Sequence, residues 1–281
     1  MNAVRSSVLR QARRGGAPSG AILLLLALVA IIAPFASPYS FHATDFDARL
    51  VAPALGSQHY FGTDDLGRDL FVRTMMGVRI TLLVALVASL VSLVIGVVYG
   101  TVAGFLGGRV DALMMRVVDA LYALPFIFFV ILLMVTFERS LLLMFVAIGA
   151  INWLDMARIV RGQTLALKER EYVEAARLIG VPTRRIILRH ITPNLLGVVV
   201  VYLTLAVPQA ILIESFLSFL GLGVQEPRTS LGALVNGGVA HMEQAPWVLL
   251  IPAGMLALIL LAFNFLGDGL RDALDPRAAR R

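Results

Sequence analysis

Six stretches of this 281-residue sequence are long, apolar and free of charged residues. A helix needs about 20 apolar residues to cross the roughly 30 Å hydrocarbon core of a bilayer. Hydrophobic residues make up 59% of the chain and charged residues only 15%, against about 25% charged in a soluble domain. The sequence therefore predicts an all-α integral membrane protein with six transmembrane helices, over Ala21–Ala36, Ile80–Gly108, Ala120–Phe137, Ser140–Leu154, Ile191–Ile213 and Gln244–Gly267.

The first apolar run, residues 21–36, follows four arginines at positions 5, 10, 13 and 14. A basic stretch followed by a short apolar run also fits a secretory signal peptide. The end of the run is crowded by Pro34, Phe35 and Pro38, which leaves no convincing cleavage site of small residues. We therefore interpret the run as a retained transmembrane helix; either interpretation puts residue 40 outside the cell membrane.

Basic residues are distributed unevenly between the two sides of the predicted bundle. If residues 1–20 lie in the cytoplasm, the segments on that side carry 18 of the 24 Lys and Arg residues. Basic residues are enriched in cytoplasmic loops, so we predict cytoplasmic tails at residues 1–20 and 269–281. These flanking residues account for the net charge of +6. They do not cluster with aromatic residues, so the sequence does not predict nucleic-acid binding.

Two connecting segments are informative by their length. Only Glu138 and Arg139 separate the third run from the fourth, which predicts a tight helical hairpin. The predicted extracytoplasmic segment, residues 37–79, is much longer than a connector needs to be. Its apolar residues recur at helical spacing behind two aspartates. We therefore expect an amphipathic helix at the outer surface of the membrane, with an apolar face of Leu66, Leu70, Phe71, Met75 and Val78.

The remaining residues, 80–268, would form a core of five transmembrane helices and a cytoplasmic loop at 161–194. Within this loop, helix-forming residues from Lys168 onward end at Gly180, and Pro182 suits the start of a second short helix. That helix would end before the fifth span, bury Ile186 and Ile187, and expose Arg184, Arg185 and Arg189. The physics alone leaves two interpretations open: a surface linker, or a compact element that docks into a partner and transmits movement.

A resemblance favours the second interpretation. The sequence Glu174-Ala175-Ala176, followed by Gly180 and Pro193, resembles the EAA motif of permease subunits of ATP-binding-cassette importers. The common form of that motif ends in Ile-x-Leu-Pro, whereas this chain has His190 and the pair Pro193-Asn194. That departure resembles the peptide and nickel branch of the family.

Four further segments resemble the peptide-transport permease C subunits of this branch, in the same order along the chain. One precedes the second span and one lies near the start of the third. A third resembles an outer loop, with Leu231 where tryptophan is usual, and the last resembles the C-terminal signature. These segments are HYFGTDDLGRDLFVRTMMGVRITL (His59–Leu82), MRVVDALYALP (Met115–Pro125), SFLGLGVQEPRTSLG (ending at Gly232) and GDGLRDALDPR (Gly267–Arg277).

The resemblance implies the permease fold of a type I ATP-binding-cassette importer in the inner membrane of a bacterial cell. Its implied partners are a second homologous permease, two ATPase subunits and an extracytoplasmic substrate-binding protein. The implied cargo is di- or oligopeptide, with nickel or another small solute as the alternative. Residues implied to couple to the ATPases are Glu174, Ala175, Ala176, Gly180, Arg184 and Arg185.

The chemistry of ATP hydrolysis is absent from the sequence. A phosphate-binding P-loop needs Gly-Lys-Ser/Thr, and the only lysine, Lys168, lies between Leu167 and Glu169. There is no cysteine, and the four histidines lack the spacing of metal ligands. Gly-x-Ser-x-Gly and His-Glu-x-x-His are also missing. We predict a non-catalytic subunit without a cofactor, with ATP and Mg²⁺ bound by the partner ATPases.

Polar residues within the spans are candidates for the transport pathway. Asn152 is expected deepest, about 17 Å along its helix from Leu141, and is our pathway candidate; a helix–helix hydrogen bond is the alternative. Glu214 and Asp119 are expected near the outer and inner membrane interfaces, with Asp119 paired to Arg116. An ion-driven secondary transporter would need charges at mid-depth, and none was evident. Pro125 is expected to kink the third span.

Overall fold

The computed structural model describes residues 2–54, 59–137 and 140–274. Within this part of the chain every regular element is helical, as predicted. The elements are α1 (Asn2–Ala36), the 3₁₀ turn η1 (Phe46–Ala48), α2 (Leu70–Leu106), α3 (Gly108–Ala123), α4 (Phe126–Thr136), α5 (Leu141–Lys168), α6 (Glu171–Leu178), α7 (Thr183–Ile186), the π-helical turn η2 (Ile187–Ile191), α8 (Thr192–Phe219), α9 (Leu231–Val239) and α10 (Pro246–Leu274).

Five helical segments of the described chain are long and apolar enough to cross a membrane. They are residues 16–36 of α1, the whole of α2 and α5, the continuous stretch 183–219, and residues 246–273 of α10. The pair α3 and α4 passes the same test as a single span bent by 73°, which brings the number to the predicted six. The structure thus confirms an all-helical membrane protein.

The third span differs from the prediction of one apolar helix over 120–137. Helix α3 already begins at Gly108, and the helical geometry is interrupted between Ala123 and Phe126. Pro125 lies at this break, where it lacks a backbone N–H and disfavours helical geometry in the residue before it. The predicted turn at residues 138–139 lies outside the described residues.

The amphipathic surface helix predicted within residues 37–79 is absent from the described part of that segment. Leu70, Phe71, Met75 and Val78 are helical, but they form the first turns of the 37-residue helix α2. Leu70, Met75 and Val78 are buried in the protein. Arg73 lies within this helix, where it forms ion pairs with Asp64 and Glu226. The described residues between 37 and 69 are otherwise irregular, apart from η1 and an isolated antiparallel bridge between Thr63 and Asp69.

Helices α2 and α5 make the tightest contact of the bundle, along glycines spaced four residues apart. A Cβ atom added to Gly96, Gly100 or Gly104 would lie within 2.9 Å of α5 atoms. In a membrane, small residues on one helix face allow two backbones to approach closely. Helix α5 is thereby fixed against α2.

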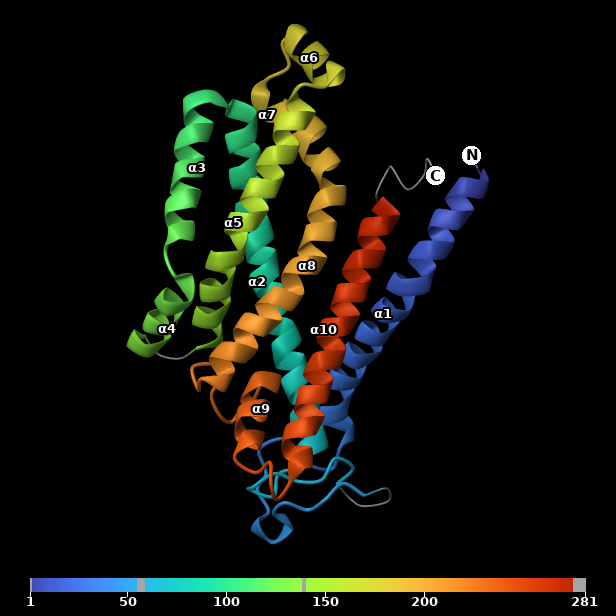
Figure 1. Cartoon of the computed structure of the whole chain (residues 1–281), viewed down its shortest axis with the longest axis vertical. Coiled ribbons are helices and arrows are strands. Elements are labelled where there is room, and N and C mark those ends of the chain that lie inside the picture. The colour runs from blue at the N-terminus through green and yellow to red at the C-terminus, as the bar shows by residue number, and fades with distance from the viewer. Residues whose placement is uncertain (1, 55–58, 138–139, 275–281) are drawn as a thin grey trace.

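The predicted coupling loop and the predicted extracytoplasmic segment lie at opposite ends of the bundle (Figure 1). Helices α6 and α7 form one end. Helices α1 and α10 pack side by side, and the N-terminal end of α1 and the C-terminal end of α10 point toward that same end. The described residues between 37 and 69 lie at the other end, with α9 close by. The arrangement separates the predicted coupling loop from the predicted extracytoplasmic segment.

Candidate coupling site

Helix α6 buries one face and exposes the other. Val173 and Ala176 are buried, and Glu174 and Ala175 are exposed. The EAA triplet therefore presents Glu174 and Ala175 to the surroundings, whereas Ala176 anchors the helix. Val173 and Ala176 belong to an apolar cluster with members on three spans, namely Phe105 of α2, Met156 and Val160 of α5, and Leu195 and Val199 of α8. Helix α6 is thus packed into the same apolar cluster as α2, α5 and α8.

Gly180 ends α6 with a defined hydrogen-bond pattern. The Gly180 N–H donates to the Arg177 carbonyl at 3.0 Å, and the Val181 N–H donates to the Ala176 carbonyl at 3.0 Å. This is the Schellman pattern, which requires a left-handed residue at the glycine position. Gly180 has a φ of +79°, and a Cβ added there would meet nothing within 4 Å. The need for glycine is therefore conformational and not steric.

The helix after the turn is not the separate short helix that the sequence predicted. It runs from α7 through η2 into α8, and residues 183–219 form one continuous span. Arg184 and Arg185 are exposed on its first turn, and Ile186 is buried. The part of the loop from Thr183 onward is therefore continuous with the fifth span, whereas α6 is separated from it by the turn at Gly180.

The π-helical turn η2 explains why Pro193 does not break this continuous span. Proline lacks an N–H and its ring clashes with the carbonyl four residues earlier in a regular α-helix. In η2 the Thr192 N–H instead donates to the Ile187 carbonyl, one residue further back. The Asn194 side-chain amide donates to the His190 carbonyl at 2.6 Å. The His190 and Pro193-Asn194 signature thus lies at the junction of the loop and the span.

Two features of this end were not apparent from the sequence. Leu178 is 88% exposed and Ile179 is 80% exposed, side by side before Gly180. Arg177 lies over the Phe105 ring, 5.0 Å from its centroid, and no described residue forms an ion pair with Glu174. The position of two large apolar residues at a helix end, directly before the turn glycine, was the available signal. Exposed apolar side chains next to exposed charges are typical of a protein-docking surface.

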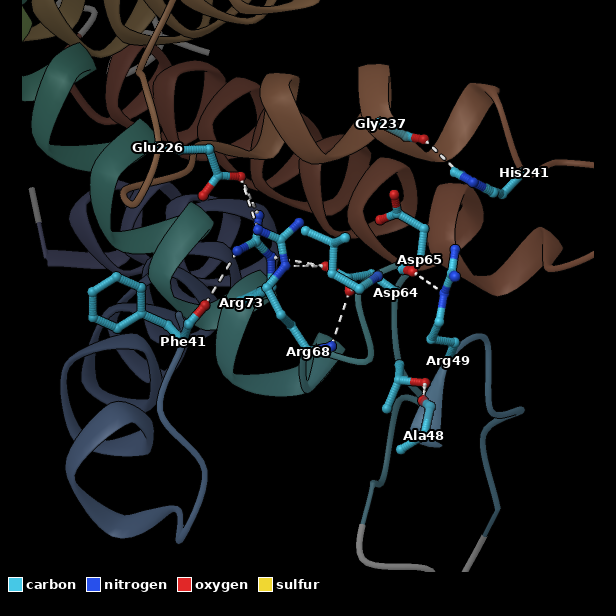
Figure 2. A network of polar contacts seen from close by, with 12 residues as sticks. Phe41, Ala48, Arg49, Asp64, Asp65, Arg68, Arg73, Glu226, Gly237 and His241 are labelled. Carbon is cyan, nitrogen blue, oxygen red and sulfur yellow. Dashed lines mark hydrogen bonds and ion pairs between the residues drawn. The ribbon is translucent and has the colours of Figure 1, made fainter. Parts of the chain in front are cut away.

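A second polar site lies at the opposite end of the bundle and ties the segment 37–69 to the α8–α9 loop (Figure 2). Asp64 accepts from the Arg68 Nε at 2.7 Å and lies 3.4 Å from the Arg73 Nε. Both arginines donate to the same oxygen of Glu226, each at 3.0 Å. Arg73 also donates to the Phe41 carbonyl at 3.1 Å. Asp64, Arg68 and Arg73 all lie in the stretch His59–Leu82, whose spacing alone does not predict this network because Glu226 is remote in the sequence.

Two of the intramembrane polar residues have partners on other helices. Asp119 pairs with Arg158 of α5 at 2.8 Å, and not with Arg116. Because α3 begins at Gly108, Asp119 lies about 16 Å along the helix and not near its inner end. Glu214 is fully buried and accepts hydrogen bonds from Thr81 and Ser218, at 3.1 and 2.7 Å. It joins α2 and α8 through hydroxyl groups.

Asn152, the pathway candidate, lies buried inside this chain on α5. Its side-chain nitrogen has no hydrogen-bond partner among the described residues. The described residues also contain no group of three His, Cys, Asp or Glu side chains arranged to hold a metal ion.

Two known protein families match separate parts of this chain. The family described as "Binding-protein-dependent transport system inner membrane component" matches residues 96–280. The "N-terminal TM domain of oligopeptide transport permease C" matches residues 14–53.

Curated relatives match over nearly the whole chain. The oligopeptide transport system permease protein OppC of Escherichia coli strain K12 is 57% identical over 264 residues, covering 94% of this chain and 87% of the relative. The OppC protein of Bacillus subtilis strain 168 is 46% identical over 256 residues, covering 91% and 83%. The dipeptide transport system permease protein DppC of the same organism is 48% identical over 260 residues, covering 92% and 81%. The chain therefore belongs to the OppC family of inner-membrane permeases of binding-protein-dependent transport systems.

Proposed function

We propose that this chain is the permease half of an ATP-driven oligopeptide importer and forms the translocation pathway with a second, homologous permease. Two ATPase subunits dock on the end formed by α6 and α7. An extracytoplasmic binding protein delivers the cargo at the opposite end, near residues 37–69. In this arrangement the two chain termini and the 161–194 loop are cytoplasmic.

The observation that carries the docking proposal is the shape of α6. Its exposed face offers Glu174 and Ala175, its end offers Leu178 and Ile179, and its buried face is packed on three spans. When the ATPases close around bound ATP, they displace α6 relative to the membrane. The continuous rod of α7, η2 and α8 carries this movement into the membrane, and access alternates between the two sides. Arg184 and Arg185 add attraction to an acidic partner surface.

Oligopeptide is the cargo that the relatives support best. The OppC relatives are named for oligopeptide transport, and DppC is named for dipeptide transport. Import of nickel or another small solute is the alternative within this family. A secondary transporter driven by ions is the alternative outside it. Asn152 stays a candidate for the pathway, to be reached after movement of α5.

The proposal is tested by purification of the tagged chain from native membranes in mild detergent, with mass spectrometry of the co-purifying proteins. We expect a second permease and one or two P-loop ATPases in stoichiometric amounts. A chain that purifies reproducibly alone would contradict the importer assembly. The Leu178→Ser/Ile179→Ser variant should lose the ATPases and keep the second permease, which separates docking from assembly of the membrane part.

A further inference from the structure

Helix α3 exposes two different faces. One face carries the apolar residues Val110, Leu113 and Val117, all strongly exposed. The other carries Arg116, Asp119 and Tyr122, also exposed. At 3.6 residues per turn these two faces point roughly 150° apart. The apolar face is suited to contact with lipid, whereas the polar face requires water or other polar groups around it.

The polar face of α3 meets polar residues of α5 in a compact group. Arg158 donates to Asp119 at 2.8 Å, and its guanidinium lies 4.1 Å from the centroid of the Tyr122 ring. The Tyr122 hydroxyl donates to Asp155. We name Asp119, Tyr122, Asp155 and Arg158 the inner polar cluster. These four residues hold two carboxylates and one guanidinium, so their own formal charge is negative; Arg116 lies one turn away on the same face of α3.

The inner polar cluster lies within the membrane. Asp119 is about 16 Å along α3 from Gly108. On α5, the neighbour of Asp155 is Met156, whose Cβ would lie 2.5 Å from a Cβ atom at Gly96 of α2. Gly96 is inside the charge-free run 80–108, about 15 Å before its last helical residue, Leu106. On α5, Asp155 is about 21 Å along the helix from Leu141, which places the cluster in the inner half of a hydrocarbon core of roughly 30 Å.

The exposure of the cluster at this depth is incompatible with contact to lipid. The side chain of Asp119 is 56% exposed and that of Arg158 is 43% exposed. A charged side chain in the hydrocarbon core costs about 2.5–3.5 kcal/mol on insertion scales, so such residues face a protein interior or a water-filled cavity. Because both charges keep a large exposed fraction in this chain, an aqueous passage satisfies them.

We propose that the inner polar cluster lines the water-filled translocation pathway and forms a net-negative station for the ammonium end of a zwitterionic solute. Asp119 and Asp155 attract the ammonium group, and Arg158 holds the two carboxylates apart on α3 and α5. The inference rests on the proposed importer function. It assigns the pathway to the α3–α5 face, next to the break at Pro125.

Cysteine accessibility tests the location, because the natural chain contains no cysteine. Ala123 is exposed, on the polar face and outside the cluster's contacts. Val117 is on the apolar face, nearer the inner end of α3. The two variants Ala123→Cys and Val117→Cys, each in the full complex in nanodiscs, are treated with a charged methanethiosulfonate, and modification is measured on this chain by mass.

We expect Ala123→Cys to react at least about tenfold faster than Val117→Cys, because thiolates form in water and not in lipid. Val117 lies closer to the inner surface, so depth alone predicts the opposite order. Equal rates, or a faster reaction at Val117→Cys, would overturn the pathway assignment. Protection of Ala123→Cys by contact with the second permease would give that result.

The charge of the station is tested in the Ala123→Cys background with a cationic and an anionic reagent. The ratio of the cationic to the anionic rate should fall several-fold in Asp119→Asn and in Asp155→Asn, and rise in Arg158→Gln. A ratio unchanged in all three variants would overturn the net-negative station. These rates do not depend on the cargo. Absence of peptide uptake together with the expected rates would therefore reject the peptide proposal alone.

Discussion

Arg73 and Glu226 are 153 positions apart in the sequence, and the Arg73 Nη2 donates to the Glu226 Oε1 at 3.0 Å. This contact joins the start of α2 to the loop between α8 and α9. Arg73 is buried, whereas the Glu226 side chain is 61% exposed. The two carboxylates of the network differ in environment, because Asp64 is buried and Glu226 is exposed. Both nevertheless contact Arg68 and Arg73.

The difference in burial predicts unequal effects of the same chemical change. Asp64→Asn removes a buried carboxylate that two arginines surround, so we expect a loss of about 3–5 kcal/mol in stability. Glu226→Gln alters an exposed partner and should cost about 0.2–1 kcal/mol. Thermal unfolding of the purified complex measures both. Equal shifts of the unfolding midpoint would contradict the inference that the buried Asp64 contributes more to stability than the exposed Glu226.

The conformation of Gly180 predicts an effect on coupling that is separate from folding. A leucine with left-handed backbone geometry costs about 1–2 kcal/mol. Gly180→Leu should therefore disturb the end of α6 and abolish stimulation of the ATPases by the loaded binding protein. Abundance in the membrane should be unchanged, because a Cβ at this position meets no neighbour.

Two control variants make this prediction specific. Gly180→Asn should retain most of the stimulation, because asparagine tolerates the left-handed region. Gly162→Leu, at an exposed helical glycine of α5 with free space around it, should behave like the natural chain. Normal stimulation in Gly180→Leu would refute the coupling role of the turn.

The exposed apolar end of α6 predicts a loss of ATPase binding on substitution. Leu178→Ser/Ile179→Ser removes two large side chains from the docking surface, whereas Leu106→Ser changes an exposed apolar residue at the same end of the bundle, on α2. Truncation of a central interface residue costs about 2 kcal/mol or more. We expect the ATPases to be recovered at least about tenfold less with the double variant and normally with Leu106→Ser. Equal recovery would place the docking surface elsewhere.

The glycine seam between α2 and α5 predicts opposite effects of two identical substitutions. A Cβ at Gly100 would lie 2.4 Å from the Ala157 carbonyl oxygen, and one at Gly254 of α10 meets nothing within 4 Å. Gly100→Ala should destabilise the protein by about 1–3 kcal/mol through overpacking. Gly254→Ala should be neutral or stabilising, because alanine favours helix by up to about 1 kcal/mol. Unfolding midpoints that shift equally would contradict the close approach of α2 and α5.

The membrane spans and the turn of α6 could be predicted because their signals are local. Apolar runs reveal spans directly, and Gly180 reveals a helix end by its conformational freedom. The continuous helix through Pro193 could not be predicted, because the π-helical turn that accommodates this proline leaves no signal in composition. The start of α2 at Leu70 was missed for a similar reason. Charges near a span look like a boundary, unless the distant partner Glu226 is known.

The intramembrane polar residues were predicted less well, because their partners are remote in sequence. Arg116 is the nearest basic residue to Asp119 within one helix turn, but Arg158 on α5 is the actual partner. The start of α3 at Gly108 was also missed, because the helix runs on through the charged residues Arg109, Asp111 and Arg116. Such contacts follow from tertiary packing and not from spacing along one helix.

The most direct test of the central claim is uptake of labelled trialanine by proteoliposomes that contain the purified complex. The complex comprises this chain, the second permease, the ATPases and the binding protein. We predict uptake that requires ATP on the membrane side that α6 faces and the binding protein on the opposite side. This uptake should be lost with Gly180→Leu. Uptake driven by an ion gradient without ATP would contradict the account.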